Sequence, residues 1–151
     1  MAKLAYDLVV AVLGGLLLLL LQQSWPRLQS IFDKDLRRQA KQISGPWDAT
    51  EIFLGSNETD TFKMDITCVG GRVTGKYKCL TGPEAGDTFS IHGTFKDQIL
   101  TFIWSKEGNR AIESGTVTAR LTTSKQLEGH GLYIEPGDEK VYPSKFFAKP
   151  S

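Results

Sequence analysis

The chain has 151 residues and a formal net charge of +1, with 18 basic and 17 acidic side chains. A nearly neutral chain of this length has room for one folded domain and lacks the excess positive charge of dedicated nucleic-acid binders, so no DNA or RNA partner is expected. The charge is uneven, because residues 27–43 carry five basic and two acidic side chains, whereas residues 44–151 carry 12 and 14.

Residues 1–26 are predicted to form an N-terminal transmembrane anchor. The run Leu8–Leu21 contains no charged or polar side chain, and the uncharged stretch continues to Pro26. A helix needs about 20 mostly apolar residues to cross the hydrocarbon core of a bilayer. A cleaved signal peptide is the alternative, but no small-residue cleavage sequence follows the run.

Two further features of the anchor bear on its orientation and packing. Lys3 alone precedes the run, whereas five Lys or Arg side chains follow it, so the positive-inside rule places the rest of the chain in the cytoplasm. Ala11 and Gly15 form a small-xxx-small pair that would let two such helices pack closely. The simpler interpretation is that Ala and Gly are common in membrane helices.

Residues 27–44 are predicted to form a basic amphipathic helix beside the membrane. Apolar side chains recur there at helical spacing, and Gly45-Pro46 ends the pattern. The apolar stripe consists of Leu28, Ile31, Phe32, Leu36, Ala40 and Ile43. This helix would either lie on an anionic membrane surface or pack under the following domain, and the sequence is compatible with both.

Residues 45–151 are predicted to form an all-β domain, because apolar residues alternate there with a period of two. Three hairpins place apolar residues opposite each other on one face: Cys68 and Val73 across Gly70-Gly71, Phe95 and Leu100 across Asp97-Gln98, and Leu121 and Leu127 across Thr123–Lys125. A slip of one residue would destroy this agreement. Adding Trp47–Leu54 and Val141–Ala148 gives eight sequential strands, which predict an up-and-down antiparallel barrel.

Loops of alternating length predict a barrel with a tight-turn end near the membrane and a long-loop mouth away from it. The inward residues at the tight-turn end form an apolar plug of Trp47, Cys68, Val73, Phe95, Leu100, Leu121, Leu127 and Phe147. The inward residues at the mouth are Glu51, Tyr77, Trp104, Glu113 and Tyr133, with Arg110, Lys106, Lys78 and Lys140 around the rim.

This mouth has the composition of a small-ligand site, since aromatic rings surround a few convergent polar groups. Inward glycines at 75, 93, 115, 129 and 131 would make room inside. The rim cations could meet phosphate groups. The alternative is that the same side chains simply fill an eight-stranded barrel, which is only just wide enough for its own interior.

No catalytic or metal-binding arrangement is evident, so neither enzymatic activity nor a cofactor is expected. His92 and His130 alternate to the outer face without ligand spacing around them. Cys68 and Cys79 face inward but are offset by six positions in register, which is too far for a disulfide and fits a reducing compartment.

Two resemblances extend these predictions. Gly45-Pro46-Trp47 looks like the Gly-x-Trp that opens the first strand of lipocalin-like (calycin) barrels. In that family a basic residue of the last strand covers the tryptophan, and pairing the last hairpin through Gly129 makes Lys145 the candidate.

The whole arrangement also resembles the membrane-anchored β-barrel effectors of bacterial cyclic-oligonucleotide antiphage signalling (CBASS). The resemblance implies a barrel that senses a cyclic dinucleotide, and a protein that then oligomerises and damages the inner membrane. The family usually has two membrane helices, whereas this chain has one apolar run. In addition, no arginine is predicted to face into the barrel, where it could contact phosphates. The likeness therefore carries over a function class and a bacterial inner-membrane location, but no site residues.

Three functions follow as hypotheses. The first is a single-pass cytoplasmic sensor that binds a cyclic nucleotide, forms a homo-oligomer and disrupts membrane lipids in antiphage defence. The second is a lipocalin-like, membrane-tethered module for a lipid or another apolar ligand. The third is a filled barrel that acts as a scaffold for protein interaction.

Overall fold

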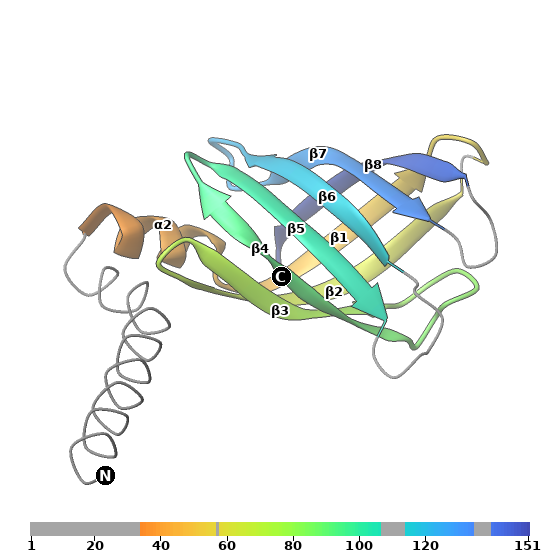
Figure 1. Cartoon of the computed structure of the whole chain (residues 1–151), viewed down its shortest axis with the longest axis horizontal. Coiled ribbons are helices and arrows are strands. Elements are labelled where there is room, and N and C mark those ends of the chain that lie inside the picture. The colour runs from red at the N-terminus through yellow and green to blue at the C-terminus, as the bar shows by residue number, and fades with distance from the viewer. Residues whose placement is uncertain (1–33, 57, 107–113, 135–139) are drawn as a thin grey trace, which may run out of the picture.

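The computed structural model describes residues 34–56, 58–106, 114–134 and 140–151. Helix α2 is followed by eight antiparallel strands, which close into a barrel in the order β1 to β8 (Figure 1). The elements are α2 (Lys34–Ile43), β1 (Gly45–Phe53), β2 (Thr59–Val69), β3 (Arg72–Cys79), β4 (Thr88–Lys96), β5 (Ile99–Lys106), β6 (Ser114–Leu121), β7 (Leu127–Ile134) and β8 (Val141–Pro150).

The predicted anchor, with Leu8–Leu21 and the pair Ala11 and Gly15, lies outside the described residues. No helix in the described part of the chain is both long and apolar enough to cross a membrane.

The predicted registers of all three hairpins are confirmed. Cys68 pairs with Val73, Phe95 with Leu100, and Leu121 with Leu127. Both two-residue turns have positive φ at both positions, 58° and 80° at Gly70-Gly71 and 51° and 65° at Asp97-Gln98. That geometry matches the twist of the flanking strands, which fixes the register at the turn.

The predicted orientation of the last strand is wrong by one residue. Ser144, Phe146 and Ala148 of β8 are buried, whereas Lys145 and Phe147 face outward, and Phe147 is 41% exposed. Lys145 therefore does not cover Trp47 from inside, and Phe147 is not part of the apolar plug. Successive apolar residues at 146–148 allow either orientation, and pairing with β1, where Ala49 lies opposite Ala148, selects the observed one.

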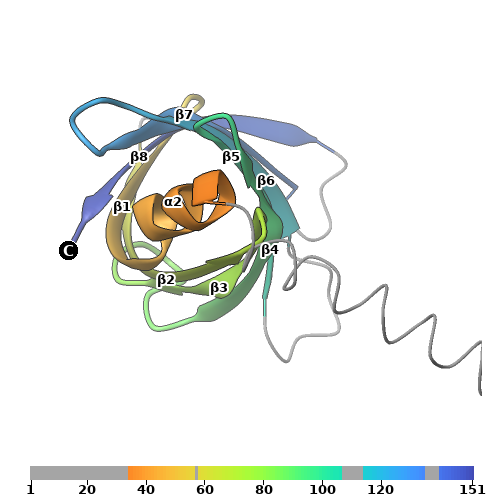
Figure 2. The same ribbon diagram turned by 90° about the vertical axis from the view of Figure 1, so that its left-hand side faces the viewer.

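Helix α2 lies across the tight-turn end of the barrel (Figure 2). Ile43 is fully buried, and Ala40 packs against the core. The indole N–H of the buried Trp47 donates to the carbonyl oxygen of Ile43 at 2.9 Å, and the hydroxyl of Ser44 accepts from the backbone N–H of Cys68 at 2.9 Å. The apolar stripe of the predicted helix thus packs under the domain over residues 34–43, while residues 27–33 lie outside the described part.

The barrel interior is continuous with this plug and is filled by side chains from all eight strands. Inward glycines do not leave the room predicted from sequence. At Gly75, Gly93 and Gly129 a Cβ would collide with a backbone carbonyl oxygen of a neighbouring strand. These positions let neighbouring strands approach closely and bend, which is how glycine kinks shape small barrels.

Candidate functional site

Glu51 is the centre of a buried polar cluster at the mouth end of the barrel. It is only 2% exposed. The hydroxyl of Ser144, itself fully buried, donates to Glu51 Oε1, and the hydroxyl of Tyr77 donates to Glu51 Oε2 at 3.4 Å. A carboxyl group inside an apolar barrel needs such donors, because an unpartnered charge there is strongly unfavourable.

Burial raises the pKa of the Glu51 carboxyl above its ordinary value, although the hydrogen bonds from Ser144 and Tyr77 act in the opposite direction. Burial and the neighbouring Glu51 also raise the pKa of the Tyr77 phenol. Both shifts favour the neutral forms, so this cluster is suited to hydrogen bonding within the barrel.

Trp104 completes the inner layer of the site. Its ring lies against Phe89 at 5.2 Å between centroids and against Tyr77 at 6.2 Å. Tyr77 in turn stacks on Phe62 at 4.4 Å. The indole N–H of Trp104 is buried and has no hydrogen-bond partner among the residues that the structure describes.

The side chains of Glu51 and Trp104 lie directly against two of the inward glycines. A Cβ at Gly131 would meet the carboxylate of Glu51 at 2.6 Å, and one at Gly115 would meet the indole of Trp104 at 2.6 Å. The space that these glycines leave is therefore occupied by the site residues themselves. The inner layer is filled, as the third hypothesis requires.

A second, half-buried aromatic layer lies nearer the mouth. Tyr133 stacks on Tyr142 at 5.2 Å with an angle of 24° between the rings, and Phe53 meets Tyr133 edge-on at 5.1 Å. All three are partly exposed and share the inward face with Glu51 and Ser144. We call Glu51, Phe53, Tyr77, Trp104, Tyr133, Tyr142 and Ser144 the mouth cluster.

Four of the six predicted ligand-binding residues, Glu51, Tyr77, Trp104 and Tyr133, therefore belong to this cluster. Arg110 and Glu113 lie outside the described residues. Sequence reasoning missed Phe53, Tyr142 and Ser144. Phe53 follows the alternation of β1 from Glu51 and could have been found, whereas Tyr142 and Ser144 were missed because the orientation of β8 was wrong.

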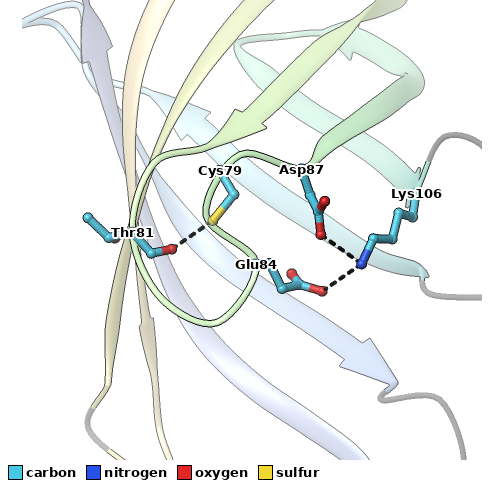
Figure 3. Close-up of polar contacts among 5 residues, drawn as sticks. All are labelled: Cys79, Thr81, Glu84, Asp87 and Lys106. Carbon is cyan, nitrogen blue, oxygen red and sulfur yellow. Dashed lines mark hydrogen bonds and ion pairs between the residues drawn. The ribbon is translucent and has the colours of Figure 1, made fainter.

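The loop between β3 and β4 forms part of the rim of the mouth and is joined to β5 by ion pairs. Lys106 of β5 pairs with Asp87 at 2.8 Å and with Glu84 at 3.6 Å, and the thiol of Cys79 donates to the carbonyl oxygen of Thr81 at 2.8 Å (Figure 3). Burial raises the pKa of the Cys79 thiol to about 11. Lys106 is thus neutralised by two carboxylates, which weakens its predicted role as a phosphate contact.

Replacing Lys106 with methionine is expected to loosen this loop with little effect on the barrel. The pairs are partly exposed, so the unfolding free energy should fall by about 0.5–1 kcal/mol at most. Hydrogen exchange should nevertheless quicken at the amides of Cys79 and Gly86, which bridge the loop to its own base. Unchanged exchange at both amides would show that the ion pairs do not hold the loop.

Glu51 is expected to make the barrel less stable as the pH rises. Because the folded pKa lies above the ordinary value of 4.5, the stabilisation is full below that value and is lost as the pH rises through the folded pKa. Glu51→Gln removes this dependence on pH. As the pH rises, the unfolding free energy of the variant relative to that of the parent should grow by about 1.4 kcal/mol for each unit by which the folded pKa of Glu51 exceeds 4.5. Urea unfolding of both proteins between pH 4 and pH 8 measures this, and a constant difference would contradict it.

Comparison with known proteins supports the fold. No family model matches the chain, and the search of curated proteins gave no match. The solved structure of EF1p2_mFAP2b bound to DFHBI is similar, with a TM-score of 0.57 and 12% sequence identity over 77% of this chain and 99% of that one. At this identity the likeness shows the barrel fold alone. Membership of the CBASS effectors stays a prediction.

Proposed function

We propose that this protein is a membrane-anchored β-barrel that binds a small, flat ligand at its mouth. The observation that carries the proposal is the juxtaposition of a buried carboxyl group, a buried indole N–H without a described partner, and three half-exposed aromatic rings. Ser144 and Tyr77 partner the carboxyl group of Glu51, whereas the indole N–H of Trp104, buried without a described partner, is unfavourable for folding on its own. A ligand that accepts a hydrogen bond from Trp104 and stacks on the rings would offset that penalty.

The chemistry of the mouth cluster favours an aromatic or largely apolar ligand over a strongly anionic one. Its rings stack with flat molecules, and Glu51 would repel an anion whenever it is ionised. EF1p2_mFAP2b, which has the same kind of barrel, binds the small molecule DFHBI. That likeness supports the use of this fold as a ligand carrier.

Cyclic-nucleotide sensing is the second candidate, and the stacked pair Tyr133 and Tyr142 favours it. Bases stack on exposed aromatic faces, and a carboxylate can accept from a guanine N–H. Its phosphates would need cations, and Lys106 is already paired with Glu84 and Asp87. Oligomerisation and membrane disruption would follow from this candidate and are proposed only with it.

The test starts from the full chain purified in a neutral detergent. Organic extraction and mass spectrometry identify any ligand that copurifies, and thermal unfolding with DFHBI, cyclic di-GMP and cyclic di-AMP tests added ligands. Tyr133→Ala together with Tyr142→Ala should weaken binding by about tenfold or more, since each stacked ring contributes roughly 1–3 kcal/mol.

His92→Ala together with His130→Ala is the matched control, because both histidines lie on the outer wall. This double variant should bind like the parent. A copurified apolar molecule supports the first candidate, and stabilisation by a cyclic dinucleotide alone supports the second. The absence of both overturns the ligand-binding proposal in favour of a filled scaffold.

A further inference from the structure

A cleft of about 990 Å³ lies at the end of the barrel opposite the mouth, and residues of α2 and of the turn that joins β6 to β7 line it. Its floor is apolar and includes Trp47, Leu121 and Pro150. Its walls carry Lys34, Arg37, Arg38 and Lys41 from α2 and Lys125 from the turn. None of the lining side chains is an Asp or a Glu.

The four helix cations lie on one side of α2 because they are spaced at i, i+3, i+4 and i+7. Like charges at these spacings destabilise a helix, and each such pair works against α2. In the described residues no carboxylate forms an ion pair with any of the five cations of the cleft. An anion bound in the cleft would relieve the repulsion among these cations.

The local conformation of the turn between β6 and β7 places Lys125 across the cleft from α2. Thr122 accepts from the backbone N–H of Gln126 through its hydroxyl, and Lys125 has a φ of 60°. This tight conformation places Lys125 on the same cleft as Arg37 and Lys41. Cations therefore reach the cleft from two elements far apart in the sequence.

We propose that this cleft binds a ligand with two phosphate groups. The five cations are enough to neutralise two phosphate groups, which together carry about two to four negative charges. Each phosphate group can also accept charge-assisted hydrogen bonds from several Lys or Arg side chains. The apolar floor would contact the organic part of a phosphate ester. The inference does not depend on a ligand at the mouth, because no residue of the mouth cluster lines this cleft.

Two sources share this chemistry, namely a lipid headgroup and a free diphosphate. Basic pockets on the cytoplasmic side of membranes bind cardiolipin headgroups, and a cardiolipin carries two phosphates. The cleft also lies at the end of the barrel where α2 begins, to which residues 1–33 are joined. A free diphosphate would reach the same cations from solution.

The experiment compares both sources on the full chain in a neutral detergent at constant ionic strength. Thermal unfolding is followed while sodium pyrophosphate is added, or while cardiolipin replaces phosphatidylcholine in the mixed micelles. A bound ligand raises the midpoint in proportion to its occupancy of the folded state. The main variant is Arg37→Gln, Arg38→Gln and Lys41→Gln combined, and Lys125→Gln is a second variant that leaves α2 unchanged.

The matched control is Lys63→Gln, Lys78→Gln and Lys145→Gln combined, which removes the same charge from the outer wall. The cleft variants should lose about tenfold or more in affinity, and the control less than about twofold. Stabilisation by cardiolipin alone identifies the lipid as the source, and stabilisation by pyrophosphate identifies a soluble ligand. Equal losses in cleft and control variants, or no stabilisation by either probe, would overturn the proposal.

Discussion

Gly129→Ala is expected to destabilise the barrel by roughly 3 kcal/mol, because it forces a side chain into the backbone of a neighbouring strand. A Cβ at this position would collide with the carbonyl oxygen of Thr118 and lie 2.5 Å from the Cα of Ala119. Neither group is the flexible end of a side chain, so β6 and β7 must separate. Urea unfolding of the variant measures the loss as a lower midpoint.

Gly55→Ala is the control for this substitution, because a Cβ at Gly55 meets nothing within 4 Å. The unfolding free energy should change by less than about 0.5 kcal/mol, as at other open surface positions. If the two glycine variants were equally stable, the close approach of β6 and β7 at Gly129 would not be a constraint on the barrel.

Trp47→Ala is expected to cost about 3–5 kcal/mol, since it removes a large buried side chain from the plug at the tight-turn end. Trp47 is 2% exposed, and its indole N–H holds the last carbonyl group of α2. The loss should therefore have two parts, a weaker core and a helix released from the barrel. Chemical unfolding reports the first, and hydrogen exchange over residues 34–43 reports the second.

Trp47→Phe separates the two parts, because phenylalanine keeps an aromatic ring but has no N–H. Its unfolding free energy should fall by only about 1–2 kcal/mol, while exchange in α2 still quickens. Slow exchange in α2 in both variants would show that apolar contacts through Ile43, and not the hydrogen bond to Trp47, position the helix.

The fold was predictable from sequence wherever a tight turn fixed the register. Gly70-Gly71 and Asp97-Gln98 leave one way for the flanking strands to pair, and alternation then assigns every side chain to a face. The segment between Ile134 and Val141 is longer than a two-residue turn of this kind, and Phe146 and Phe147 are both apolar. The orientation of β8 depended on its contact with β1, which is about a hundred residues away in the chain.

The mouth cluster was predictable in part for the same reason. Tyr77, Trp104 and Tyr133 follow from their hairpins, and Glu51 follows from the alternation of β1. The packing around the inward glycines was not predictable, because the sequence does not show whether the space beside a glycine is empty or is filled by a neighbouring side chain. Gly115 and Gly131 are covered by Trp104 and Glu51, and only three-dimensional packing reveals this.

The pairing of β1 with β8 has a consequence for how the protein is made. Trp47 lies opposite Pro150, so β1 cannot obtain its second partner until nearly all of the barrel has left the ribosome. Until then β1 and β7 each expose an unpaired edge, and such edges recruit strands from other chains. Long-range closure of this kind is also slow. Synthesis at high rates should therefore favour strand exchange between chains. If β8 pairs with β1 of its own chain the barrel closes, whereas pairing with β1 of another chain joins the two chains.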